Sequence, residues 1–138
     1  MTHSLHISNR VKIVILWLML AISWLIHHLY GLFNIYYNET LIIEGATGEA
    51  PVLHHIYRIL FEGMAYCFAV LTVEISASFF KWLTFSWAVL SALYDVYHVA
   101  MAVIYEPSNV SEIFILLLAV VANVFLVRAL YAWIYHRG

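Results

Sequence analysis

The stretch NVSEIFILLLAVVANVFLVRALYAWIY, residues 109–135, is the clearest indication of how this chain folds. Its apolar run exceeds the roughly 20 residues that a helix needs to cross the hydrocarbon core of a bilayer. Three more segments of this kind lie at about 11–37, 52–78 and 80–105. Only helices and closed barrels satisfy their backbone polar groups in lipid, and segments this long with few turn residues favour helices. The sequence therefore predicts four transmembrane helices.

The composition agrees with a membrane protein. The chain has 138 residues, of which 65% are hydrophobic and 10% are charged, whereas soluble domains are about 45–50% apolar and about 25% charged. We expect one transmembrane domain over residues 1–138. The first apolar segment is too long for a signal peptide, so we expect it to be retained as a helix. Scattered basic residues argue against nucleic-acid binding, and the single Cys67 excludes an intrachain disulfide.

The connections and charges predict how the helices are arranged. Short connections make sequential helices antiparallel neighbours, so the expected fold is all-α, an integral membrane four-helix bundle of up-down-up-down order. The basic residues fall at one side of this topology: Arg10, Lys12, Lys81, Arg128 and Arg137. The loops of the other side carry acidic residues alone: Glu39, Glu44, Glu49 and Glu106. The positive-inside rule then predicts that both termini are cytoplasmic.

Polar or ionisable side chains inside the predicted spans are the main clue to function. There are seven: His27, His28, Arg58, Glu62, Asp95, His98 and Asn123. Such residues are costly in lipid and by default indicate a functional site. Counted with the rise of an α-helix, three of them lie roughly 13–15 Å from the outer ends of their helices: His28, Glu62 and Asp95. Each lies on a helix face shared with small residues, which predicts that it points into the bundle.

The leading interpretation is a buried site that binds a metal ion or a redox cofactor. Asp95 and His98 share one helical face, and His28 and Glu62 complete a mixed nitrogen and oxygen ligand set that suits Zn, Fe, Mn or Cu. Four-helix bundles build such sites from facing helices. We expect the fifth and sixth residues of the site, Arg58 and Asn123, to surround these ligands. A less favoured variant is haem, with His28 and His98 as axial ligands.

Two other interpretations stay open. The charged residues could form an internal ion-pair network, with Arg58 bonded to Glu62 or Asp95, that fixes helix register without a ligand; the protein would then be a non-catalytic subunit of a membrane complex. Alternatively, they could bind a hydrophobic small molecule or transfer a proton. A single bundle of this size has a limited core, so we also expect a homo-oligomer or a membrane partner.

The order of several residues resembles the EXPERA group, which includes emopamil-binding-protein-type sterol isomerases. The residues concerned are Ile26–His27, Gly31–Phe33 and Tyr36–Tyr37 in the first segment, Glu62 and Cys67 in the second, Tyr94–Val96 in the third and Asn123 in the fourth. The acidic residue that this family carries one turn after the histidine is absent here. The resemblance implies a lipid-open cavity for a sterol, with His27 and Glu62 as the proton-transferring catalytic pair and Asn123 in the cavity wall. A desolvated carboxyl group is suited to such chemistry.

Overall fold

The computed structural model describes residues 7–37, 40, 42 and 44–135, apart from the side chain of Asn34, and this part of the chain contains helices and no strands. The helical elements are α1 (Asn9–Leu32), the 3₁₀-helix η1 (Phe33–Tyr37), α2 (Val52–Tyr57), the π-helix η2 (Arg58–Gly63), α3 (Met64–Glu74), α4 (Ser78–Tyr105) and α5 (Val110–Tyr135). The all-helical prediction is therefore confirmed for the residues that are described.

Four of the helical stretches are long and apolar enough to cross a membrane: Asn9–Tyr37, Val52–Glu74, Ser78–Tyr105 and Val110–Tyr135. They match the four predicted segments to within a few residues. The second ends at Glu74 rather than at the predicted residue 78, because the backbone is extended at Ile75 (φ −94°, ψ 125°) and again at Ala77 (φ −60°, ψ 142°).

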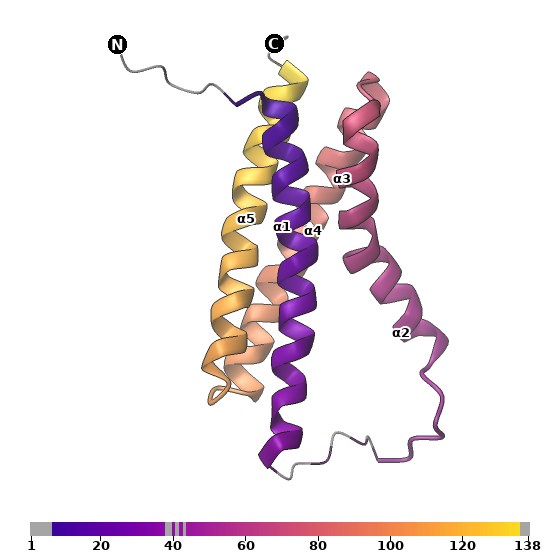
Figure 1. Cartoon of the computed structure of the whole chain (residues 1–138), viewed down its shortest axis with the longest axis vertical. Helices are drawn as coiled ribbons and strands as arrows, with labels where there is room; N and C mark the ends of the chain where they lie inside the picture. The colour runs from indigo at the N-terminus through magenta and orange to yellow at the C-terminus, as the bar shows by residue number, and fades with distance from the viewer. Residues whose placement is uncertain (1–6, 38–39, 41, 43, 136–138) are drawn as a thin grey trace.

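Helix α1 is central to the packing, with α5 on one side and α3 on another, while α4 packs on α5. Figure 1 shows α1, α4 and α5 close together and the α2 end of the second span leaning away from them. Trp17, Phe68 and Leu126 are almost fully buried in the core. Ala88 and Ala119 are buried beside them, and such small side chains let helix backbones approach closely in membranes.

Two side-chain hydrogen bonds define the relative direction of the helices. Arg10, at the start of α1, donates to the carbonyl oxygen of Thr72 near the end of α3 at 2.6 Å. Lys81, at the start of α4, donates to the carbonyl oxygen of Trp133 near the end of α5 at 3.0 Å. The last carbonyls of a helix have no partner within the helix. These bonds therefore satisfy helix ends and also place α1 antiparallel to α3, and α4 antiparallel to α5.

The π-helix η2 interrupts the second span between α2 and α3. Its wider turn is seen where the Met64 amide donates to the carbonyl of Ile59, five residues earlier. The extra residue shifts the helical register. On either side of this turn, α3 buries Ala65, Phe68 and Ala69, whereas α2, which leans away from the other helices, buries no residue. Short π-helical turns are rare in proteins, and those that occur are often found at functional sites.

Candidate functional site

The departure of α2 from the other helices leaves a cavity of about 360 Å³, which we call the α2 cavity. Three helical spans and the residue before α2 contribute to its wall: Trp24 and His28 from α1, Pro51, Leu53, His54 and Tyr57 from α2 and its start, Arg58 and Glu62 from η2, and Tyr94 and His98 from α4. Its volume lies within the range of about 300–1,000 Å³ that is usual for small-molecule sites.

One hydrogen bond in the wall of this cavity joins α1 to the π-helix. His28 Nε2 lies 2.8 Å from Glu62 Oε1, and both side chains are partly exposed, by 38% and 28%. With a proton on Nε2, the histidine donates and the carboxylate accepts. Because both groups border the cavity, their remaining hydrogen-bonding capacity is available to a ligand.

The neighbouring histidine faces a different helix. His27 Nδ1 lies 3.0 Å from Glu112 Oε1 on α5, within ion-pair distance although not aligned for a hydrogen bond. Glu112 is 7% exposed and accepts a hydrogen bond from the Asn109 side chain. Consecutive residues on a helix point about 100° apart. The pair His27 and His28 thus contacts carboxylates from two different helices on either side of α1.

Asp95 forms a separate polar contact inside the helix packing. The Asn123 side-chain amide donates to Asp95 Oδ2 at 2.5 Å, which joins α4 to α5. Both side chains are fully buried. The Oδ1 atoms of Asp95 and Asn123 have no hydrogen-bond partner among the described residues.

Aromatic rings fill the space between these polar contacts. The Trp24 ring lies edge-on to the rings of His27 and His98, at centroid distances of 5.4 and 5.1 Å. Phe61 of the π-helix stacks on Tyr94 of α4 with centroids 4.0 Å apart, which holds the π-helix against α4. His98 Nδ1 is buried and finds no hydrogen-bond partner in the described part of the chain.

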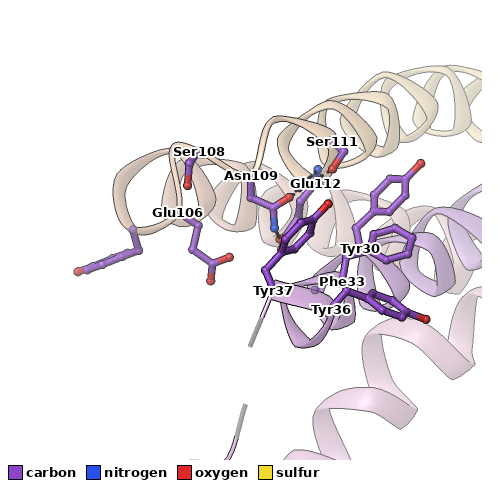
Figure 2. Close-up of a pocket in the computed structure, with 11 residues that line it drawn as sticks. Tyr30, Phe33, Tyr36, Tyr37, Glu106, Ser108, Asn109, Ser111 and Glu112 are labelled. Atoms are coloured by element: carbon purple, nitrogen blue, oxygen red, sulfur yellow. Dashed lines mark hydrogen bonds between the residues drawn. The ribbon is translucent and has the colours of Figure 1, made fainter. Parts of the chain in front are cut away.

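A larger open cleft, of about 960 Å³, lies where α1 and η1 approach the start of α5. Figure 2 shows Tyr30 and Tyr37 projecting from α1 and η1, and Asn109 and Glu112 from the start of α5 and the residue before it. Glu112 therefore borders this cleft while it also contacts His27.

The structure brings some of the predicted site residues together and separates others. Of the four predicted metal ligands, His28, Glu62 and His98 line the α2 cavity, whereas Asp95 is bonded to Asn123 outside it. Arg58 also lines the cavity. Within the described residues, no group of three or more His, Cys, Asp or Glu side chains is arranged to hold a metal ion.

His27, which the EXPERA resemblance pairs with Glu62, instead lies against Glu112, and Glu62 lies against His28. The other residue implied by the resemblance, Asn123, is likewise outside the lining of the α2 cavity.

Trp24, Tyr94 and Glu112 also lie in this region, although none of them was among the predicted site residues. Trp24 precedes His28 by four residues, the spacing of one helix face, and both line the same cavity. Glu112 lies in the first turn of α5, near the level of His27. The tertiary packing shows that it is buried and that its contact is this histidine.

Comparison of the chain with protein-family models, with curated proteins and with solved structures gives no match. Its own fold and site are therefore the basis for a functional proposal. These describe an all-helical chain with four helices able to span a membrane and a polar, aromatic cavity beside a π-helix.

Proposed function

We propose that this chain is an integral membrane protein whose four spans cross the bilayer in up-down-up-down order with both termini in the cytoplasm. Large apolar side chains such as Leu25, Leu93 and Phe114 are 60–64% exposed on the helix surfaces, as expected of residues that face lipid. Arg10, Lys12, Lys81 and Arg128 fall at one end of the spans, and the positive-inside rule assigns that end to the cytoplasm. This orientation can be tested with single cysteines introduced at either end of the spans. A thiol reagent that cannot cross the membrane should label, in intact cells, only the cysteines at the outer end.

The function that the geometry supports best is the binding of a hydrophobic small molecule with a polar head in the α2 cavity. The observation that carries this proposal is the cavity itself, where the His28–Glu62 pair borders the same space as Trp24 and Tyr94. Ligand sites combine apolar and aromatic walls with a few polar groups that orient the ligand. A sterol or another lipid offers the matching chemistry, a hydrogen-bonding head on an apolar body.

Arg58, which also lines the cavity, supports the binding of a ligand with a polar head. Within the described residues, its guanidinium forms no hydrogen bond or ion pair, although it borders the same cavity as Glu62. An isolated arginine that faces a cavity is available to an oxygen-rich or acidic head group, since its planar fork of donors suits carboxylate and phosphate groups.

Binding of a fluorescent sterol and of a fluorescent fatty acid to detergent-purified protein tests this function. For the probe that binds the wild-type protein, H28A/E62A should lower the affinity by tenfold or more. Glu74→Gln is the matched control, because it removes a carboxylate from the same span at an exposed position outside the cavity. The proposal would be refuted if neither probe bound saturably. It would also be refuted if H28A/E62A left the binding unchanged.

The EXPERA resemblance implies a reaction on a ligand of this class, the isomerisation of a bound sterol. In it, a carboxyl or imidazolium group would give a proton to one carbon of a sterol double bond, which leaves a cation at the other carbon. A base would then remove a proton from the carbon next to this cation, so that the double bond shifts by one position without net change in atoms or electrons. Glu62 borders the cavity, whereas His27 reaches Glu112. Turnover of a sterol that persists in His27→Ala would exclude the role that the resemblance gives to His27.

Metal binding is the second candidate function. Its support is that His28, Glu62 and His98 border one cavity and that His98 Nδ1 is buried without a partner among the described residues. A Zn, Fe, Mn or Cu site from these residues would require their side chains to converge, and Asp95 would have to leave Asn123. Elemental analysis of the purified protein, with an absorbance spectrum for haem, decides this: substoichiometric metal and no Soret band would reject it.

We also propose that the protein assembles, either with itself or with another membrane protein, since one bundle of this size has a limited core. Native mass spectrometry from detergent measures the stoichiometry. A fixed partner that is lost on Arg58→Ala would favour a non-catalytic subunit over a ligand-binding protein.

A further inference from the structure

A second site lies at the opposite end of the spans from the α2 cavity. The groove between α1 and α5 encloses about 480 Å³, and Figure 1 shows the two helices side by side there, with the start of α1 near the end of α5. Its main lining residues are the basic Lys12 and Arg128 and the apolar Ile15, Leu16 and Phe125. We call this site the basic groove.

The positive charges of the basic groove are available to a ligand. Four basic residues lie at this end in the described part of the chain, and two of them are committed to helix ends: Arg10 donates to Thr72 and Lys81 to Trp133. Lys12 and Arg128 have no hydrogen bond or ion pair among the described residues, and no acidic residue lines the groove. Among the described residues, therefore, nothing neutralises the two positive charges of the groove.

The position of these charges suits the head group of a membrane lipid. Lys12 is three residues from the start of α1, about 4.5 Å along the axis, and Arg128 is seven residues from the end of α5, about 10 Å along the axis. Long arginine side chains can reach along apolar surface toward the membrane interface, and Arg128 and Lys12 border the same groove. Both charges then lie near the depth of lipid phosphates.

The rest of the groove suits an acyl chain. Ile15 is 46% exposed and Phe125 is 51% exposed, so both present apolar surface outward beside the charged end. A free anion would gain nothing from this apolar wall, whereas a lipid contacts the basic residues and the wall together. Basic pockets between transmembrane helices bind anionic head groups in this way.

We propose that the basic groove binds an anionic phospholipid, with its phosphate at Lys12 and Arg128 and one acyl chain along Ile15, Leu16 and Phe125. This site is separate from the α2 cavity and does not depend on what that cavity binds. The lipid would fill the groove between α1 and α5 and so strengthen the contact between these two helices.

Native mass spectrometry of the protein with phosphatidylglycerol or phosphatidylcholine tests this proposal. The full chain should retain phosphatidylglycerol preferentially, and K12Q/R128Q should reduce that preference roughly tenfold to thirtyfold, as expected for two basic contacts. The charge-conserving K12R/R128K should keep it. R10Q/K81Q is the matched control, because it removes the same charge from the same end and leaves the groove lining intact.

Three outcomes would overturn the proposal. They are an unchanged preference in K12Q/R128Q, an equal loss in R10Q/K81Q, and displacement of phosphatidylglycerol by excess inorganic phosphate, which would show a site for free anions. If K12Q/R128Q does not fold, Lys12→Gln alone serves in its place, since Lys12 is exposed, and about a fivefold loss is then expected.

Discussion

His28 on α1 and Glu62 on the π-helix are joined by a contact of 2.8 Å, and this contact closes one side of the α2 cavity. It is formed because the π-helix holds Glu62 against α1 while α2 leans away. A hydrogen bond, an irregular helical turn and a cavity thus occur at one place.

The His28–Glu62 pair should contribute modestly to stability. Both side chains are partly exposed, and exposed pairs are worth about 0.2–1 kcal/mol. A double-mutant cycle with His28→Ala and Glu62→Ala, measured by unfolding in mixed detergent micelles, should give a coupling free energy of about 0.5–1 kcal/mol. A value several times larger would show that the pair is primarily structural.

Removal of one residue from the π-helix should separate folding from ligand binding. Ile59 is 63% exposed, and its deletion should restore regular α-helical hydrogen bonding and turn the preceding residues by about 100°. Arg58 and α2 would then leave the cavity wall while α3 keeps its packing. We expect the unfolding free energy to be unchanged or higher and the binding of a lipid probe to be lost. Deletion of Val52, at the start of α2, is the control and should leave probe binding largely intact.

The buried pair of Asp95 and Asn123 should behave as a unit. Asn123→Leu removes the amide donor from a fully buried carboxyl group, which should cost about 1–3 kcal/mol. Replacement of both residues by leucine should cost less than the single change, because no polar group is then left without its partner. Additive effects in the double variant, measured by the same unfolding experiment, would contradict this coupling.

The core of the bundle should be most sensitive at Phe68. This side chain is 1% exposed and its ring lies 5.2 Å from that of Trp17, so Phe68→Ala should destabilise the protein by about 3–5 kcal/mol. Val70→Ala, two residues along and 51% exposed, should change the unfolding free energy by less than about 0.5 kcal/mol. Equal effects of the two substitutions would show that the packing of α3 differs from that described.

Arg10 should stabilise the end of α3. It donates to the carbonyl oxygens of both Thr72 and Val73, which have no partner within the helix. Arg10→Ala should destabilise the protein by about 1–2 kcal/mol and increase hydrogen exchange selectively in the last turn of α3. Arg10→Lys should recover part of this loss, because a lysine can reach one of the two carbonyls but lacks the arginine fork.

The sequence alone was sufficient to predict the helical spans. The segments at 80–105 and 109–135 correspond closely to α4 (Ser78–Tyr105) and α5 (Val110–Tyr135), since long apolar runs have few other ways to satisfy the backbone in lipid. Asp95, which was predicted to point into the bundle, is also fully buried.

The corresponding prediction for the second span was less accurate. Glu62 was predicted to point into the bundle, but its side chain is 28% exposed. Arg58, one turn before it, is exposed, whereas Ala69 is buried. The π-helix between them adds a residue to the turn and changes the register. No residue in RILFEG marks this wider turn on its own, because it depends on how Phe61 stacks on Tyr94 and how Phe68 packs in the core.

The sequence by itself determined that the chain forms four long apolar helices and that costly polar residues lie within them, because both follow from composition and from the hydrogen-bonding demands of a lipid environment. The tertiary structure alone decided which of these residues meet. His27 and His28 are adjacent in sequence, yet one contacts Glu112 of α5 and the other Glu62 of the π-helix. These partners depend on how each helix is rotated and packed around α1, and side-chain spacing within a single helix carries no information about that rotation.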